Sequence, residues 1–156
     1  MSIVMEPIAH VEGTRDVVED DYWGGEETRI VLAAQYPDEA LDGIEEFSHA
    51  EIIFFFDRLE PSKVFTGARR PRGNPEWPAV GVFAQRTKNR PNRMGATICR
   101  IVRREGRTLV VSGLDAIDGT PVLDIKPVFA EFLPAEPVTQ PGWSHELMRF
   151  YWADKK

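Results

Sequence analysis

Apolar residues occur along the chain in short runs and in alternation with polar residues, a pattern that indicates β-strands rather than long helices. The run at 52–56 is β-branched and aromatic, and it predicts a buried strand. Further strands are expected over 28–32, 80–84, 96–103, 107–114 and 122–126. Glu105-Gly106 lies between two of these segments, where glycine can supply the positive φ of a tight hairpin.

Two segments have the residue spacing of short helices. Within 37–47, apolar residues recur at helical intervals, and acidic residues occupy the other face. Further along the sequence, Ser144 can cap a helix in which Leu147, Phe150 and Tyr151 share one face. About six strands and two short helices predict a mainly β fold, with the sheet closed or strongly curled into a small β-barrel.

Three polar segments are expected to form loops between these elements. Residues 12–27 are acidic and contain glycine, and they place Tyr22 and Trp23 in a polar setting where both rings are expected to be exposed. Residues 69–78 contain three prolines, which exclude a helix and a central strand. Residues 85–93 are polar and basic.

Length and composition limit the class of protein. A chain of 156 residues is expected to form a single domain over 1–156, and its 42% hydrophobic and 28% charged residues exclude a disordered or coiled-coil chain. No apolar run approaches the roughly 20 residues of a membrane helix, and the first residues lack the pattern of a secretory signal, so a cytoplasmic protein is expected. Cys99 is the only cysteine, and the three histidines are far apart in sequence, so we expect no metal.

The net charge of −6 is unevenly distributed along the chain. Residues 1–60 contain 16 acidic and 3 basic residues, whereas residues 61–127 contain 5 acidic and 13 basic residues. The basic middle segment indicates either a local anion-binding surface or a second block of charge that neutralises the first across one fold.

Residues 86–93 contain four cations in eight positions. A guanidinium group binds a carboxylate or a phosphate through two parallel hydrogen bonds, and the amide of Asn92 can read the edge of a base. The alternative is a solvated basic loop without a ligand. In the second polar segment of interest, 118–121, a carboxylate and a hydroxyl lie in a turn that could bind ribose hydroxyls or face a cationic centre, or form a plain loop.

Three motifs in this order resemble one family. They are Phe47-Ser48-His49, the loop 86–95 with its Arg-x-x-x-Arg-Pro-Asn-x-x-Gly pattern, and Asp118-Gly119-Thr120-Pro121 followed by Asp-Ile-Lys-Pro at 124–127. They resemble the TrmO-like, also called VirR-like, tRNA adenine N6-methyltransferases over roughly residues 5–130. The resemblance implies a small single-sheeted β-barrel, a homodimer, and S-adenosylmethionine as the cofactor. The methyl group would go to N6 of threonylcarbamoyl-adenosine beside the anticodon of tRNA.

The same resemblance implies roles for individual residues. The cofactor contacts that it carries over are Arg86, Ala96, Asp57, Arg58, Asp118, Gly119, Thr120 and Pro121. The match at Asp57-Arg58 is weaker because the residue types differ. The cations and the amide proposed for the anticodon loop are Lys88, Arg90, Asn92, Arg93 and Arg70, and the candidates for a catalytic role are Asp118 and Asn92.

Two departures from the family pattern leave alternatives open. The family's Pro-Arg-Gln element, which contacts the cofactor, is replaced by the acidic segment 20–25. In this segment Tyr22 and Trp23 are candidates for cofactor binding by stacking on its adenine; the alternatives are that they stack on a substrate base or belong to the core. The extra C-terminal domain of some members is absent from this sequence, which has an aromatic segment at 143–152 that a homodimer is expected to bury. The alternatives are a methyltransferase of the same fold that acts on another RNA or on a small molecule, and a non-catalytic RNA-binding barrel.

Overall fold

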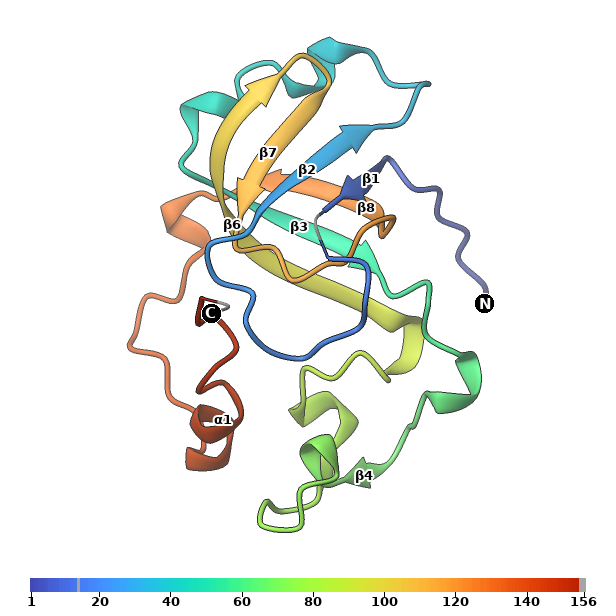
Figure 1. Ribbon diagram of the computed structural model, residues 1–156, viewed down its shortest axis with the longest axis vertical. Coiled ribbons are helices and arrows are strands. Elements are labelled where there is room, and N and C mark those ends of the chain that lie inside the picture. Colours follow the sequence, from blue (N-terminus) through green and yellow to red (C-terminus); the bar gives the residue numbers. More distant parts are fainter. Residues whose placement is uncertain (14, 155–156) are drawn as a thin grey trace.

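Six strands close into one antiparallel barrel in the computed structural model, which describes residues 1–13 and 15–154 (Figure 1). Around the barrel the order of strands is β1-β2-β7-β6-β3-β8. Their bounds are β1 (Ala9–Glu12), β2 (Glu27–Leu32), β3 (His49–Phe55), β6 (Met94–Glu105), β7 (Thr108–Ser112) and β8 (Pro121–Pro127). A separate two-stranded sheet pairs β4 (Ala68–Arg69) with β5 (Val80–Gly81). The predicted mainly β fold, a small single-sheeted barrel, is confirmed.

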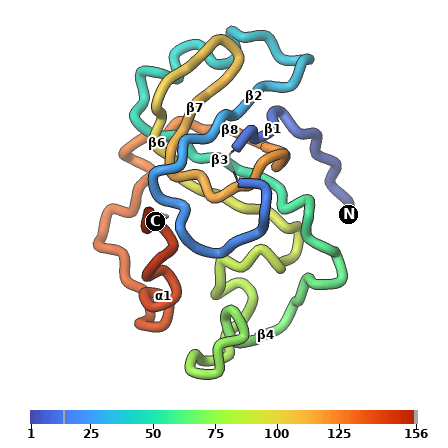
Figure 2. The backbone as a smooth tube through the Cα atoms, in the orientation of Figure 1, coloured from blue at the N-terminus to red at the C-terminus, as the bar shows by residue number. Residues whose placement is uncertain are grey.

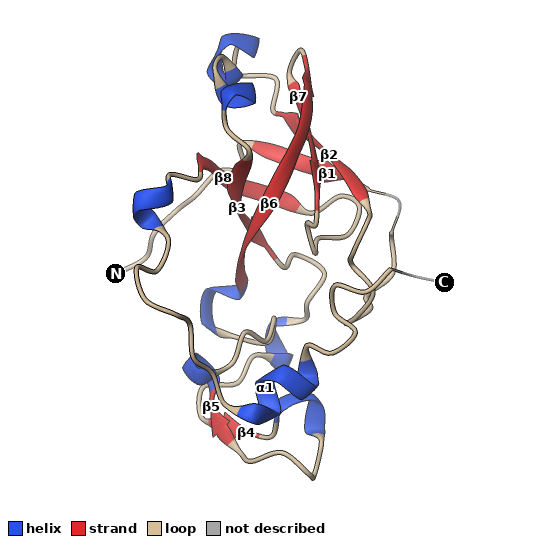
Figure 3. Ribbon diagram, turned by 90° about the vertical axis from the view of Figure 1, so that its left-hand side faces the viewer, coloured by secondary structure: helices blue, strands red, loops and turns tan. Residues whose placement is uncertain are grey.

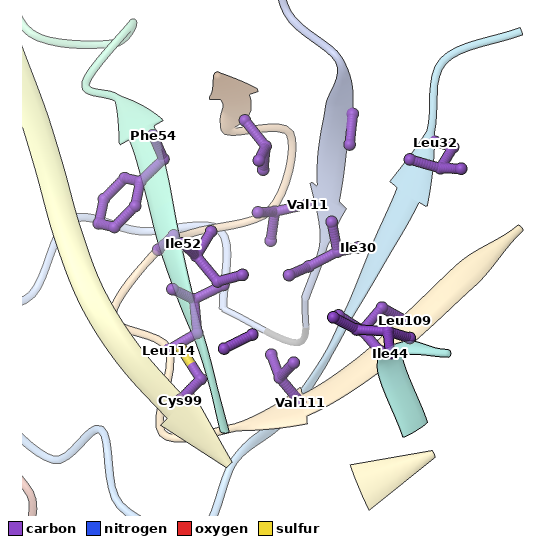
Figure 4. Packing of buried hydrophobic residues seen from close by; sticks show 14 of the residues in the cluster. Val11, Ile30, Leu32, Ile44, Ile52, Phe54, Cys99, Leu109, Val111 and Leu114 are labelled. Atoms are coloured by element: carbon purple, nitrogen blue, oxygen red, sulfur yellow. The ribbon is translucent and has the colours of Figure 1, made fainter. Parts of the chain in front are cut away.

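The inward-facing side chains of these strands fill the barrel (Figure 4). In β3 every second residue is buried, so that Ala50, Ile52 and Phe54 belong to the core. In β2, Ile30 and Leu32 are buried in the same way. Each large apolar side chain removed from water in this way contributes roughly 1.5–3 kcal/mol. Closure of the sheet also pairs the backbone groups that an open edge would leave exposed.

The helical predictions are only partly correct. Residues 37–47 form two 3-10 turns rather than one amphipathic helix, because Gly43 between them has φ +87. Helix α1 (Gly142–Leu147) exists, but its N-cap is Pro141, and the Ser144 hydroxyl donates to the Pro141 carbonyl from within the helix. The 3-10 turns are η1 (Asp38–Leu41), η2 (Ile44–Glu46), η3 (Pro61–Lys63), η4 (Pro71–Gly73), η5 (Val82–Ala84), η6 (Pro91–Arg93) and η7 (Ala130–Phe132).

The strand predictions are more accurate, although the short strand β4 was not expected and two further segments differ. No strand was predicted at β1, and the predicted strand at 80–84 ends at Gly81 and continues as the turn η5. The tight hairpin between β6 and β7 is confirmed, with Gly106 at φ +60. No helix in the described part of the chain is long and apolar enough to cross a membrane.

One end of the barrel carries the long connections, and the other carries the β6–β7 hairpin with η1 and η2 (Figures 1 and 3). β3 ends, and β6 and β8 begin, at the same end, because β3 is antiparallel to both. The segment with β4 and β5 and the segment with α1 extend beyond this end (Figure 3). A hydrogen bond from Trp77 Nε1 to Glu146 Oε2, 2.7 Å long, joins the two segments.

The segment after α1 runs along residues 22–24 (Figure 2). The backbone N–H of Trp23 donates to the Tyr151 carbonyl over 2.7 Å, and the next residue, Gly24, donates to Ala153. A Cβ atom at position 24 would overlap the carbonyl of Trp152, so this close approach requires glycine. The aromatic residues at 150–152 therefore cover their own chain, while Trp152 stays 43% exposed; the predicted homodimer stays a prediction.

Many acidic residues from the first part of the chain form ion pairs with cations of the basic middle segment. These pairs include Arg72–Asp21 at 3.0 Å, Lys88–Asp20 at 3.6 Å, Arg104–Asp42 at 2.8 Å, Arg107–Asp38 at 3.0 Å and Arg103–Glu27 at 3.4 Å. The two charge blocks thus neutralise each other over much of the surface. Arg86, Arg90 and Arg93 are among the described cations that form no ion pair with a carboxylate, and they lie within eight residues of one another in the sequence.

Candidate functional site

The barrel end at which β3 stops is built around Phe54. This residue pairs with Gly95 of β6 on one side and with Val122 of β8 on the other. Neighbouring strands lie roughly 4.8 Å apart, so the starts of β6 and β8 are about 10 Å from each other. A Cβ atom at Gly95 would lie 2.5 Å from Phe54 Cζ, and the absence of a side chain at position 95 therefore allows the ring to pack across β6.

A pocket of about 280 Å³ opens beside the start of β6. It is lined by Phe83, Gln85, Arg86, Arg90, Met94, Gly95 and Ala96. Arg86 Nη2 donates to the Ala96 carbonyl over 2.7 Å, and Arg90 Nη1 donates to the Gln85 carbonyl over 2.6 Å. Each contact uses one donor of a guanidinium group that has five, and no carboxylate lines the pocket. The pocket therefore offers free cationic donors to an anionic group.

The turn at 118–121 lies across β3 from this pocket, at the start of β8. The carboxylate of Asp118 accepts from the Gly13 backbone N–H over 3.1 Å, and the Thr120 hydroxyl donates to the Ile117 carbonyl. Gly119 has φ +83, which glycine adopts without strain. Pro121 begins β8 and pairs with His10. The turn is thus held by its own side chains, and one Asp118 oxygen has no protein contact assigned to it in the described structure.

Arg58 joins the turn to the loop that follows β1. Its guanidinium donates to the Asp118 carbonyl over 3.1 Å and to the Asp16 carbonyl over 2.6 Å. The neighbouring Asp57 is exposed and its backbone N–H donates to the Phe55 carbonyl. Two predicted cofactor segments, 57–58 and 118–121, are therefore in direct contact, whereas Arg86 and Ala96 line the pocket on the far side of β3.

The expectation that Trp23 is exposed is wrong, and the alternative that it belongs to the core is confirmed. Its ring is 3% exposed, and the guanidinium of Arg15 lies 3.7 Å above the ring centroid. Arg15 is itself buried and forms a 2.8 Å ion pair with Glu26, so Trp23 belongs to a small internal cluster and is closed to a base. Tyr22 is 39% exposed and stacks on Phe150, which leaves part of its ring accessible.

The residues predicted to contact RNA are divided among several surroundings. Lys88 is paired with Asp20, and Arg70 donates to the carbonyls of Pro75 and Trp77 within its own loop. Arg93 lies over the Phe55 ring and donates to the Leu59 carbonyl over 2.9 Å. Asn92 is exposed in the turn η6, with φ +65. Arg90 is the member of this set that lines the pocket.

A partly buried cluster of hydrogen-bonded side chains around Asp115 was not predicted from the sequence. Thr97 Oγ1 donates to one carboxylate oxygen of Asp115 over 2.5 Å, and the Tyr151 hydroxyl donates to the other. Burial and the Asp115 carboxylate raise the pKa of Tyr151, while the positive charges of Arg86 and Arg72 oppose this rise. The cluster therefore connects the start of β6 with the segment after α1. No spacing in the sequence signals this contact, because its three members come from separate parts of the chain.

In the described ranges, 1–13 and 15–154, no group of three His, Cys, Asp or Glu side chains could hold a metal ion. The chemistry of the barrel end rests instead on guanidinium groups, backbone carbonyls and the Asp118 carboxylate.

Comparison with known proteins assigns this arrangement to a family. The sequence profile described as the tRNA-methyltransferase O (TrmO) N-terminal domain matches residues 20–132, which include the pocket and the turn at 118–121. The chain belongs to the TrmO N-terminal domain family. The resemblance inferred from the three motifs is thereby confirmed.

Relatives of this TrmO N-terminal domain have names that refer to S-adenosylmethionine or tRNA. The chain is 42% identical over 96 residues to the tRNA (adenine(37)-N6)-methyltransferase of Mus musculus, covering 62% of this chain and 22% of the mouse protein. It is 34% identical over 138 residues to a Methanothermobacter thermautotrophicus protein named "Probable S-adenosyl-L-methionine-binding protein", covering 84% of this chain and 93% of that protein. The crystal structure of TrmO from Pseudomonas aeruginosa superposes with a TM-score of 0.68 at 28% identity, covering 91% of this chain and 62% of that chain. The chain thus spans only part of the mouse enzyme and of the bacterial TrmO.

Proposed function

We propose that this chain binds S-adenosylmethionine at the end of the barrel where β3 stops and transfers its methyl group to RNA. The observation that carries the proposal is that a cationic pocket without carboxylates and the Asp118 turn lie on the two sides of β3. The pocket lies beside the start of β6 and the turn at the start of β8, and these two strand starts are about 10 Å apart. This separation suits an elongated ligand that has an anionic group at one end and hydroxyl groups at the other. The family relationship supports the same ligand.

Arg86 and Asp118 have the chemistry to hold the two ends of the cofactor. Arg86 keeps free N–H donors for the carboxylate of the methionine part, and Asp118 has an oxygen available to accept from a ribose hydroxyl. S-adenosylmethionine supplies the activated methyl group, and the protein supplies binding and orientation. Asp118 is also the candidate catalytic residue, because its carboxylate can accept the proton that the methylated nitrogen loses, whereas Asn92, the other candidate, can only accept a hydrogen bond from that N–H.

The acceptor that we propose is N6 of threonylcarbamoyl-adenosine next to the anticodon of tRNA. The support comes from the relatives named as tRNA (adenine(37)-N6)-methyltransferases and from the unpaired cations beside the pocket. The acidic segment at 19–21 could repel phosphates, but Asp20 and Asp21 are paired with Lys88 and Arg72, so part of their charge is neutralised. A homodimer belongs to the same proposal, and light scattering at micromolar concentration tests it.

Calorimetric titration with S-adenosylmethionine tests the cofactor site. Arg86→Ala should weaken binding by roughly 10- to 150-fold, the equivalent of losing a charge-assisted contact of about 1.5–3 kcal/mol. Lys88→Ala is the matched control: it removes a cation two positions away that is already paired with Asp20 and does not line the pocket. Equal affinities for the two variants would refute the assignment of Arg86.

Mass spectrometry of tRNA nucleosides from a deletion strain tests the acceptor. Loss of the N6-methylated threonylcarbamoyl-adenosine, restored by the wild-type chain and not by Arg86→Ala, is the expected result. An unchanged nucleoside profile in the deletion strain would favour a different RNA or a small molecule as the acceptor.

A further inference from the structure

Phe83 is an exposed aromatic residue on the rim of the pocket, and the proposed cofactor contacts leave it without a role. Its side chain is 76% exposed, and it lines the pocket together with Arg86 and Arg90. Rings of this size usually bury much of their surface on folding, so its exposure at a concave site requires an explanation.

The outward position of Phe83 is fixed by its neighbours on both sides. It is the middle residue of η5, whose first residue, Val82, is 1% exposed and donates its N–H to the Gly67 carbonyl. Gln85 is 8% exposed, and its side-chain amide donates to the carbonyls of Arg69 and Val80 over 2.8 and 2.9 Å. These anchors hold the backbone of η5 in place, so Phe83 stays at the rim of the pocket.

The groups around the ring define the kind of ligand that fits. The charged side chains lining the pocket are the guanidinium groups of Arg86 and Arg90, and no carboxylate faces them. An apolar protein surface placed here would strip water from both cations without replacing their hydrogen bonds. A nucleotide satisfies both features, because its base can stack on the ring while its phosphate meets a guanidinium group.

We propose that Phe83 is the stacking platform for the unpaired purine of the RNA that receives the methyl group. This inference rests on the proposed function and adds a subsite for the acceptor base directly beside Arg86 and Ala96. Stacking on a ring is tolerant of base identity, so Phe83 positions the base and does not itself select adenine.

The test uses the full chain and a short anticodon stem-loop RNA with 2-aminopurine at the adenosine that follows the anticodon. Stacking quenches the fluorescence of 2-aminopurine, so binding of the wild type should quench it. Phe83→Ala should weaken RNA binding by about 5- to 150-fold, the equivalent of roughly 1–3 kcal/mol for one stacked base, and should abolish the quenching. Phe83→Tyr should restore both, and in Phe83→Ala the loss of RNA affinity should exceed any loss of S-adenosylmethionine affinity.

Phe132→Ala is the matched control. Phe132 is 86% exposed but lies in η7, beyond the opposite end of β8, so its removal should leave RNA binding unchanged. Unchanged RNA affinity and quenching in Phe83→Ala would overturn the inference, as would a selective loss of S-adenosylmethionine affinity, which would make the ring a wall of the cofactor site. A wild type that does not bind S-adenosylmethionine would refute the proposed function itself, and with it the basis for this subsite.

Discussion

Replacing Gly95 by alanine should damage both the stability of the barrel and the candidate site. The new Cβ atom would lie 2.5 Å from Phe54 Cζ, 2.6 Å from Phe54 Cε2 and 3.0 Å from Phe56 Cζ, where ordinary contacts are 3.4–4 Å. About 1 Å of overlap must therefore be relieved. The Phe54 ring is 1% exposed and packs edge-on against Phe56 at 5.3 Å, so it has little room to rotate.

The magnitude follows from this geometry. Overpacking of a well-filled core costs typically 1–3 kcal/mol, and contact with two rings places Gly95→Ala in the upper part of that range. For a chain of this size each kcal/mol lowers the midpoint of thermal unfolding by about 2–4 °C, so a decrease of roughly 4–12 °C is expected. If β6 moves instead of the ring, the Ala96 carbonyl, which accepts a hydrogen bond from Arg86, moves with it. S-adenosylmethionine affinity should then fall as well.

Thermal unfolding followed by circular dichroism, together with calorimetric titration, measures both effects. Gly67→Ala is the control, because a Cβ atom at Gly67 meets no atom within 4 Å. An unfolding midpoint for Gly95→Ala that equals that of the control would show that the packing of Phe54 against β6 has been misjudged.

Three further predictions concern the groups around the candidate site. Asp118→Asn should leave the unfolding midpoint nearly unchanged, because an amide oxygen still accepts from the Gly13 N–H, yet weaken S-adenosylmethionine in calorimetry; full affinity would exclude a ribose contact. Tyr151→Phe removes a charge-assisted donor from Asp115 and should lower the unfolding free energy in urea by roughly 1.5–3 kcal/mol, whereas an unchanged value would mean that water replaces the hydroxyl. Burial and the Asp115 charge raise the pKa of Cys99, so the folded thiol stays protonated while the unfolded thiol ionises near pH 9, and stability should decrease as the pH rises above about 9. A thiol reagent should label Cys99 only in denaturant, and labelling of the native protein would contradict this.

The sequence predicted the barrel well because its strands have local signals. The alternation in β3 and the Gly106 turn between β6 and β7 depend on residues close together in the chain, and both are as expected. The helix at 37–47 failed because one residue, Gly43, adopts a positive φ that the apolar spacing does not reveal. β1 was missed because its four residues are too few to show a period clearly.

The candidate site was predictable as a set of segments but not as a set of contacts. The cations at 86–93 stand out in composition, yet the sequence does not show that Lys88 is paired with Asp20 whereas Arg86 is without a carboxylate partner in the described structure. Trp23 was misjudged for a similar reason, since its polar neighbours in sequence conceal a cover formed by Arg15. Contacts between residues far apart in the chain depend on closure of the barrel, which local patterns do not encode.

The hydrogen bonds between residues 22–24 and 150–153 also constrain when the protein can become functional during synthesis. The acidic loop after β1 lies beside the candidate site early in the chain, but the partners that order it leave the ribosome about 130 residues later. Barrel closure has the same timing, because β1 must wait for β8. Long-range pairing of this kind slows folding. A nascent chain can therefore contain every residue of the basic pocket and still lack the ordered loop next to it, so ligand binding should begin only after residues 150–153 have left the ribosome.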